Sequence, residues 1–393
     1  MENFVFSNPT TIIFGKGTIG QAGREAGKYS NKILLVYGEK HIRKSGIRDL
    51  VAASLAEAGV EFLELSGVKP NPGLEHVYKG ISLCRENGID FILAVGGGSA
   101  IDTAKAIGVG AGHPEDVWMF FEGIARPKKT VPVGVVLTMP GTGSESSSSC
   151  VITNERAQIK RSINYSLIKP VFAIMDPELT FSLPAYHTAC GVADAMSHAM
   201  ERYFTAVPDV DCTDRLCEAL IKSLIRNGPI AIEKPGDYAA RAEIMLASKF
   251  AHDNTVGVGR VGDFGTHKFG HQLSAVYGLA HGASITAVFP SWMRYVYKRD
   301  VNRFAQYAVN VWNVDFTPSD PEGMALEGIR RTAEFYRRIG MPANLREAAI
   351  PDDRFEDMVD RIFSITGETV GNYMKLNRED CLNVLRLAYD TDL

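Results

Sequence analysis

The feature that most constrains this chain is a series of short, largely apolar runs in its first half, separated by segments with helical spacing. The runs occupy residues 32–37, 60–65, 91–95 and 131–137. Apolar residues at consecutive positions are typical of strands covered on both faces, whereas a strand with one wet face alternates. Because helical segments at about 50–58 and 75–86 lie between the runs, we predict a parallel sheet wound with crossovers.

The pattern changes after Asp176. From Pro184 onward few runs resemble strands. Helical spacing dominates the segments 190–204, 211–227, 238–253, 320–339 and 378–388. A chain of 393 residues fits two domains of ordinary size. We therefore expect a Rossmann-like α/β domain over residues 1–183 and an all-α domain over residues 184–393.

The composition is that of an ordinary globular protein, with 45% hydrophobic and 22% charged residues and a formal net charge of −4. No basic stripe is present, which argues against nucleic acid as a partner. The six cysteines form no C-x-x-C pair, as is usual in a reducing compartment. The N-terminus lacks the features of a signal peptide, and no apolar run reaches the roughly 18 residues of a spanning helix. We expect a cytoplasmic protein with no membrane partner.

One glycine-rich segment combines the features of a phosphate-binding loop. Gly96-Gly-Gly-Ser-Ala-Ile-Asp102 follows an apolar run and opens a predicted helix over about 100–109. Glycines let the backbone approach a phosphate closely, and the start of a helix directs free N–H groups and its positive dipole end at the anion. Ser99 and Asp102 have the spacing of a capping box, which would fix this helix start.

Two further segments fit G-x-G-x-x-G, a pattern that is weak by itself. Gly15–Gly20 follows a candidate strand, and Glu39 lies near the spacing of a ribose-binding acid, but a tight turn explains these glycines equally well. Gly257–Gly262 has no strand before it. A polar loop, Thr138–Glu145, follows the last apolar run. Two polar loops at carboxyl ends of strands predict a shared ligand-binding crevice, so the first domain is expected to bind a dinucleotide.

The second half carries a metal-binding pattern. Asp194 and His198 are four positions apart, on one face of a helix. Three of the nine histidines, His267, His271 and His281, follow close together. One aspartate with histidines suits iron(II) or zinc better than calcium or magnesium. Taken singly, each histidine is better explained as a packing or surface residue. That interpretation is kept for His41, His76, His113, His187 and His252, which have no such neighbours.

The order of these motifs resembles the iron-containing, or group III, alcohol dehydrogenase family over essentially the whole chain. The closest subgroup is that of the NAD(P)H-dependent butanol dehydrogenase-like aldehyde reductases. The resemblance is carried by Asn8-Pro-Thr, Phe14-Gly-x-Gly17, Gly67-Val-x-Pro-Asn-Pro72, Gly96-Gly-Gly-Ser-x-x-Asp-x-x-Lys105, Thr142-Gly-Ser-Glu145, Asp176-Pro, Leu183-Pro184, Gly191-x-x-Asp-x-x-x-His198, His267-x-x-x-His-x-Leu-Ser274 and His281-Gly282.

The resemblance implies a role for each site residue. The second domain would bind the metal and the substrate. The metal ligands would be Asp194, His198, His267 and His281, with iron(II) expected in preference to zinc. His271 would stay unligated beside the nicotinamide and substrate. The pyrophosphate and ribose would be held by Gly97, Gly98, Ser99 and Asp102. The rest of the cofactor would contact Gly38, Asn71, Thr138, Thr142 and Lys160.

Three segments depart from the family pattern. Asp263-Phe-Gly-Thr-His267 replaces the more usual Asp-Trp-Ala-Thr-His, and Ser146-Ser147 stands where relatives often have Met-Asn. Tyr37-Gly-Glu-Lys-His41 differs from the Gly-Gly-Gly-Ser of close NADP-using relatives. The first two changes are expected to alter the shape of the substrate pocket.

The implied activity is hydride transfer between NAD(P) and a primary alcohol or aldehyde such as butanol or butanal. The metal would polarise the substrate oxygen, and His271 is a candidate member of a proton relay. Two alternatives stay open on the residues alone. A lyase or synthase similar to dehydroquinate synthase would also use NAD and a metal, and a metallohydrolase would make the glycine loops incidental.

Two further expectations concern assembly and cofactor choice. The segment 3–14 has strand character, and in relatives such a segment pairs with a second copy, so we expect a homodimer. Glu39 would accept hydrogen bonds from the ribose of NAD and repel a 2′-phosphate. The basic residues Lys40, His41, Arg43 and Lys44 would favour that phosphate. We therefore predict dual use of NAD and NADP without strong discrimination.

Overall fold

The computed structural model of the protein describes residues 1–38 and 40–390. The chain divides into two compact units. The first, here called the sheet unit, comprises Ser7–Leu183 together with Pro235–Lys249. The second, the helical unit, comprises Met1–Phe6, Pro184–Lys234 and Phe250–Leu393.

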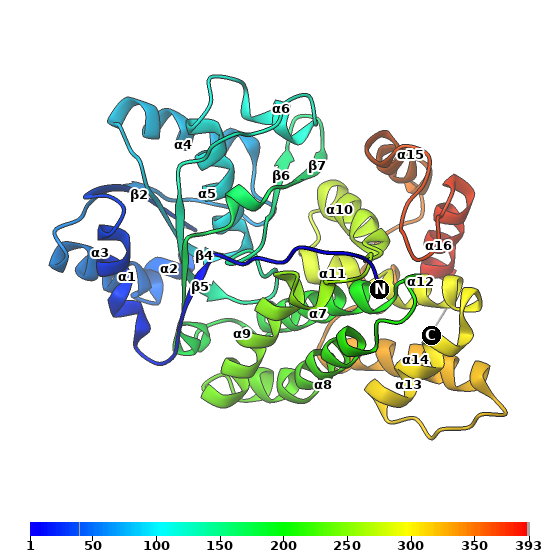
Figure 1. Ribbon diagram of the computed structural model, residues 1–393. Helices are drawn as coiled ribbons and strands as arrows, with labels where there is room; N and C mark the ends of the chain where they lie inside the picture. The colour runs from blue at the N-terminus through cyan, green and yellow to red at the C-terminus, as the bar shows by residue number, and fades with distance from the viewer. Residues whose placement is uncertain (39, 391–393) are drawn as a thin grey trace. The chain divides into compact units, whose positions relative to one another are not determined.

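The sheet unit is built on six parallel strands, as the apolar runs predict (Figure 1). In their order across the sheet they are β1 (Thr11–Phe14), β8 (Phe172–Met175), β5 (Val133–Met139), β4 (Ile92–Gly97), β2 (Lys32–Tyr37) and β3 (Glu61–Leu65). The chain runs outward from β2 to β3 and then returns past β2 to β4. This reversal is a topological switch point, the place where open α/β sheets bind ligands.

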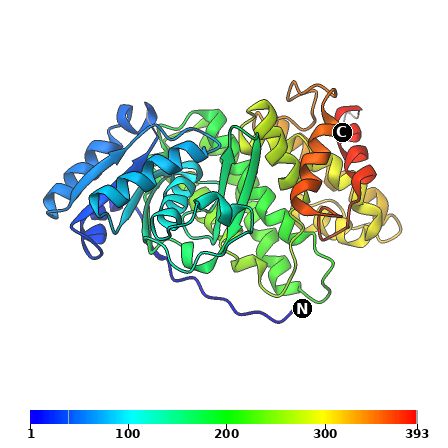
Figure 2. The same ribbon diagram turned by 90° about the horizontal axis from the view of Figure 1, so that it is seen from above.

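Helices cover both faces of the sheet (Figure 2). Because side chains alternate along a strand, Leu34 and Val36 of β2 join one apolar cluster, whereas Leu35 and Tyr37 join the other. The first cluster includes α4 (Leu74–Asn87) and α5 (Gly98–Ala111), and the second includes α1 (Ala22–Gly27) and α3 (Ile47–Glu57). Strands that are buried on both faces explain why the runs are apolar at every position.

Several elements of the sheet unit were not predicted. The short helices are α2 (Lys40–Lys44) and α6 (Val117–Phe121). A two-stranded antiparallel hairpin joins β6 (Ser149–Asn154) to β7 (Ile159–Asn164). Its alternating, partly polar strands carry no continuous apolar run. A search for such runs, which predicts β2 and β4, therefore does not predict β6 and β7.

The helical unit contains no strand among its described residues. Its helices are α7 (Ala185–Tyr203), α8 (Asp211–Glu233), the end of α9 (Tyr238–His252), α10 (Gly265–Tyr277), α11 (His281–Thr286), α12 (Phe289–Val296), α13 (Val301–Trp312), α14 (Pro321–Arg338), α15 (Phe355–Thr366) and α16 (Arg378–Asp390). Their presence confirms the predicted helical second half.

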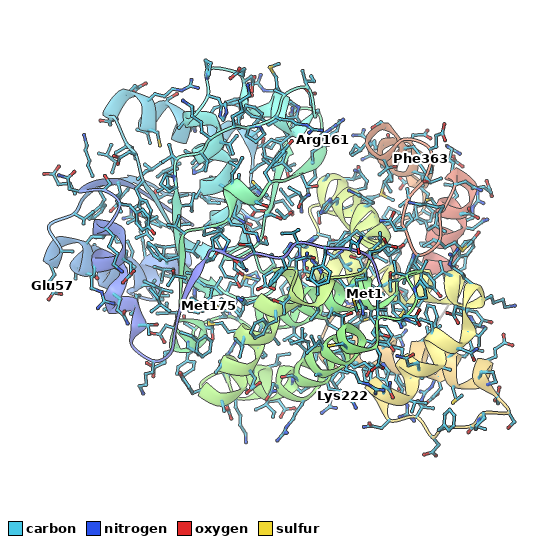
Figure 3. All side chains as sticks on the ribbon, in the orientation of Figure 1. Met1, Glu57, Arg161, Met175, Lys222 and Phe363 are labelled. Carbon is cyan, nitrogen blue, oxygen red and sulfur yellow. The ribbon has the colours of Figure 1, made fainter. Side chains whose placement is uncertain are left out.

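Helix α7 forms the core of the helical unit. It starts directly after Pro184, and from Thr188 to Tyr203 every residue is buried. Most of these residues are small or apolar, as expected of a helix inside a core, and the buried polar side chains among them include Asp194 and His198. Helix α8, by contrast, has an exposed side, on which Lys222 lies. In the sheet unit, Met175 is buried at the end of β8. Figure 3 labels both residues.

Among the described residues, no helix is both long and apolar enough to cross a membrane. The expected cytoplasmic location stays a prediction.

Candidate metal centre and nucleotide-binding loops

Helix α7 carries three functional side chains along one face. Asp194, His198 and Glu201 stand at positions i, i+4 and i+7, which lie above one another on a helix. All three are buried, because the helix passes through the core of its unit. The carboxylate of Asp194 and the imidazole of His198 are therefore shielded from bulk water.

The start of helix α10 positions His267. The carboxylate of Asp263 accepts a hydrogen bond from the backbone N–H of Gly265 at 2.9 Å. Its other oxygen accepts from the backbone N–H groups of Asn372 and Tyr373, each at 2.7 Å. Burial, with a smaller contribution from nearby Glu201, raises the pKa of Asp263 to about 6. Asp263 thus ties the first turn of α10 to the C-terminal part of the unit.

A close backbone approach positions His281. Helix α11 begins at His281 and its next residue is Gly282. A Cβ at Gly282 would lie 2.3 Å from the carbonyl oxygen of Cys190 on α7. Only glycine allows this contact, so the sequence His-Gly brings the imidazole of His281 to α7.

The three imidazoles converge on one carboxylate oxygen. The Nε2 atoms of His198, His281 and His267 lie 3.4, 3.7 and 3.9 Å from Oδ1 of Asp194. One ligand atom each of Asp194, His267 and His281 lie within 4.8 Å of one another. Atoms bound at about 2.1 Å to a tetrahedral metal are about 3.4 Å apart. The spacing of Asp194, His267 and His281 therefore fits a single ion with small adjustments, whereas His198 lies outside this set of mutually close ligand atoms.

The hydrogen bonding of these residues also fits a metal. Nδ1 of His267 bonds to the carboxylate of Glu201, while its Nε2 is buried and has no hydrogen-bond partner in the described part of the chain. The pKa of His198 lies well below its ordinary value, mainly because the ring is buried and to a smaller extent because His252 is nearby. The ring is therefore neutral and can act as a ligand. Imidazole with one carboxylate suits iron(II) or zinc.

His271 lies beside this group without joining it. It stands one turn after His267 on α10 and is buried. Its ring centroid is 5.5 Å from that of His281 and 6.2 Å from that of His267. A relay role for His271 stays a prediction.

Two residues at this centre were missed by the sequence reasoning. Glu201 accepts hydrogen bonds from Nδ1 of His267 and from Oγ1 of Thr266. Its i+3 spacing from His198 was a signal that could have found it. His252, interpreted from the sequence as a packing or surface residue, has its Nδ1 3.0 Å from Nδ1 of His198. The structure thus gives His252 a specific partner, which no local pattern marks because that partner lies on another helix.

In the sheet unit, the glycine-rich loop lies at the switch point between β2 and β4. A Cβ at Gly97 would lie 2.9 Å from Cβ of Met139, and one at Gly98 would lie 2.6 Å from the side chain of Thr142. The loop after β4 and the polar loop after β5 are therefore in direct contact. The two segments predicted to share a ligand are brought together.

The predicted capping box does not form. Helix α5 begins at Gly98 after Gly97, and no side chain in the described part of the chain caps it. Ser99 lies within the first turn, and Asp102 turns to other partners. Its two carboxylate oxygens accept from Oγ of Ser144 at 2.6 Å and from the backbone N–H of Val151 at 3.0 Å. The start of α5 thus has no side-chain cap among the described residues, which suits an anion at this place.

The other predicted cofactor residues also lie in the sheet unit. Nζ of Lys160 on β7 donates to Oδ1 of Asn71 at 2.9 Å, so these two are neighbours. Thr138 is buried in β5. Gly38 follows β2, and a Cβ there would be 3.6 Å from the carbonyl of Val68. Glu39, the predicted ribose contact, lies outside the described residues.

A glycine loop at the switch point of a parallel sheet, with an aspartate and three histidines gathered in a helical unit, defines a metal- and dinucleotide-dependent oxidoreductase. Comparison with known proteins makes the assignment specific. The chain belongs to the iron-containing alcohol dehydrogenase family. Residues 9–177 match the family described as iron-containing alcohol dehydrogenase, and residues 188–389 match its C-terminal region.

Named relatives match from end to end. The chain is 38% identical to NADH-dependent butanol dehydrogenase A of Clostridium acetobutylicum, covering 99% of this chain and 100% of the relative. It is 34% identical to the NADPH-dependent aldehyde reductase YqhD of Escherichia coli, covering 99% of each. The crystal structure of NADH-dependent butanol dehydrogenase A from Thermotoga maritima superposes with a TM-score of 0.95 at 36% identity, covering 99% of each chain. The protein is an NAD(P)-dependent alcohol dehydrogenase or aldehyde reductase that uses a nucleotide cofactor and a metal.

Proposed function

We propose that this enzyme interconverts short primary alcohols and aldehydes, with butanol and butanal as the expected pair, and binds one divalent ion through Asp194, His198, His267 and His281. The observation that carries this proposal is the convergence of three Nε2 atoms on Oδ1 of Asp194. The substrate class rests on the relatives that are named butanol dehydrogenases.

When bound, the ion would polarise the substrate oxygen, and the nicotinamide would carry the hydride. The residues of the chain have complementary tasks. Asp194 supplies the one negative charge among the four proposed ligands, while Glu201 orients the ring of His267. We assign the alcohol proton to a relay through His271. One carboxylate and three imidazoles suit iron(II) or zinc, and we expect iron(II) because the chain belongs to a family described as iron-containing.

The ligand assignment is tested by His267→Ala, with His187→Ala on the same unit as the matched control. His187 lies near the start of α7, outside the converging group. His267→Ala is expected to lower the metal content and the rate of NADH oxidation with butanal together, whereas His187→Ala should change neither. Metal content is measured by elemental analysis. Full metal occupancy in folded His267→Ala and Asp194→Ala variants would overturn the assignment.

The relay is tested by His271→Ala, which separates proton transfer from metal binding. Metal content is expected to stay at the level of the unmodified enzyme. The turnover rate should fall by about 10²-fold, as is typical when a general acid or base is removed. Loss of the metal in this variant would instead make His271 a ligand, contrary to the proposal.

Cofactor preference depends on the residues that follow β2, near the expected position of the adenosine ribose. Arg43, one of the basic residues near the expected ribose position, donates to Oη of Tyr37 at 2.8 Å and pairs with Glu64 at 3.3 Å. This pairing weakens its availability to a 2′-phosphate, so we retain dual use of NAD and NADP. Glu39→Gly is expected to lower the KM for NADPH more than that for NADH. If both values stay unchanged, Glu39 does not face the ribose.

We also propose a homodimer. Residues 1–10 have no regular secondary structure, and β1 is an edge strand that pairs only with β8 among the described strands. Phe4 and Val5 are 53% and 98% exposed. An exposed apolar segment that precedes an edge strand in the sequence is expected to pair with a second copy. Sedimentation should give a dimer, and Val5→Lys should weaken it; a stable monomer at micromolar concentration would contradict the proposal.

A further inference from the structure

Both ring nitrogens of His198 face a specific partner. Nε2 lies 3.4 Å from Oδ1 of Asp194, on the side of the proposed metal. Nδ1 lies 3.0 Å from Nδ1 of His252, and the two ring centroids are 3.9 Å apart. His252 is thus the group that contacts the side of His198 turned away from the other proposed ligands.

The positions of the ring protons decide which of the two Nδ1 atoms donates the hydrogen bond. Two ring nitrogens at 3.0 Å form a hydrogen bond only if one carries a proton and the other does not. His198 can give the lone pair of Nε2 to a metal only when its proton is on Nδ1. Nδ1 of His252 must then be the acceptor, which places the proton of His252 on its own Nε2. This arrangement fixes both tautomers.

We infer that His252 is a positioning residue that holds His198 in the tautomer and ring orientation needed to bind the metal. The inference rests on the proposed ligand set. A metal-bound histidine usually donates its second N–H to a carboxylate, a carbonyl or water, and such partners strengthen metal binding. Here a neutral imidazole takes that place.

The contact is built into the backbone. The guanidinium of Arg202, buried on α7, donates from Nη1 to the carbonyl of His198 at 3.0 Å and from Nη2 to the carbonyl of His252 at 3.2 Å. One rigid group therefore sets the separation of the two residues. Helix α9 ends at His252, and Asn254 with a φ of 75° turns the chain immediately afterwards.

The charges at the centre favour a neutral acceptor. His267 already donates to the carboxylate of Glu201, and Asp194 is the second acid that touches the proposed ligands. Two carboxylates balance one divalent cation. A third acid in the place of His252 would add a further buried charge to the centre, and removing that charge from water is costly. An imidazole accepts the hydrogen bond of His198 without adding charge.

The test compares two kinds of variant at position 252. His252→Asn keeps an acceptor, because Oδ1 of asparagine stands the same number of bonds from Cα as Nδ1 of histidine. His252→Leu and His252→Phe remove the acceptor, and phenylalanine keeps a ring of similar size. The measurements are the dissociation constant for cobalt(II), its visible absorption spectrum in each variant, and the dissociation constant for NADH as a control in the sheet unit.

The leucine and phenylalanine variants are expected to bind cobalt(II) about 10- to 100-fold more weakly and to shift its absorption bands. The asparagine variant should restore affinity to within a few-fold, and NADH binding should not change. Equal cobalt(II) affinity in all variants would overturn the inference, as would an asparagine variant as weak as the phenylalanine variant. If the unmodified protein and His267→Ala bind cobalt(II) equally, the proposed ligand set fails, which is a separate result.

Discussion

At the scale of single residues, the six cysteines differ in exposure and therefore in the expected reactivity of their thiols. Among the six thiols, Cys212 is exposed and the other five are buried. Burial raises the pKa of Cys84 and Cys381 to about 12 and that of Cys190 and Cys217 to about 11. Since the thiolate is the reactive form, these four are kept inert by their surroundings.

We predict that a thiol reagent such as dithionitrobenzoate labels one cysteine rapidly at pH 8. Only Cys212 is both reachable and outside an apolar core. The buried thiols stay protonated at pH 8 because their raised pKa values lie well above it, and they should react only as the protein unfolds. Cys212→Ser is expected to abolish the rapid phase. Rapid labelling of any thiol in folded Cys212→Ser would contradict the prediction.

At the proposed metal centre, only some of the contacting residues can be predicted from the sequence, and the reason is physical. The pairing of Asp194 with His198 is a property of one helix turn, so it is visible as a spacing. The contacts of His267 with Glu201 and of His198 with His252 join different helices. They depend on how the helices pack, which no local periodicity specifies.

At the scale of elements, helix α5 organises the loop that follows β5. The ammonium group of Lys105, fully buried, donates to the carbonyls of Ser144, Ser147 and Ser149 at 2.6, 3.0 and 2.9 Å. Asp102, one turn earlier, accepts from the hydroxyl of Ser144. One turn of α5 therefore fixes the serine-rich loop beside the nucleotide-binding glycines.

We predict that Lys105→Met destabilises the protein by on the order of 3 kcal/mol, because it leaves several buried oxygens without a donor. The midpoint of thermal unfolding should fall by several degrees, and binding of NADH should weaken. Lys79→Met, at an exposed position of α4, is the matched control and should change neither. An unfolding midpoint for Lys105→Met equal to that of the control would show that the loop needs no such anchor.

Elements with a simple burial pattern were predicted well. Strand β2 coincides with the predicted run, and β4 and β5 differ by a few residues. The hairpin of β6 and β7 was missed because its strands are only partly buried, with β6 against α4 and α5 and β7 against α6. The contact of Val151 with Asp102 is one of those that hold β6 to α5. The stability of the hairpin comes from its neighbours rather than from its own composition.

At the scale of the whole molecule, the proposed metal would join three helices that are far apart in the sequence. Asp194 and His198 belong to α7, His267 to α10 and His281 to α11. All four lie in the helical unit. An ion that binds only the folded state stabilises it by mass action, by about 2.7 kcal/mol at a free concentration of 100 times its dissociation constant.

Metal removal is therefore predicted to destabilise the helical unit selectively. Of the three tryptophans, Trp292 and Trp312 lie in that unit and Trp118 lies in the sheet unit. In a Trp118→Phe variant, fluorescence reports on the helical unit alone, and its thermal midpoint should fall after chelation and recover with added metal. If chelation leaves this midpoint unchanged, the ion does not bridge the three helices.

The four proposed ligands differ in how far water can reach them. The side chain of His281 is 23% exposed, whereas those of Asp194, His198 and His267 are 4%, 6% and 8% exposed. An ion held by several bonds leaves by losing them one at a time, and the bond that solvent reaches breaks first. The first residue of α11 is therefore expected to set the rate of metal exchange. The metal found in a given preparation would then depend on the ions in the most recent solution as well as on those present when the protein folded.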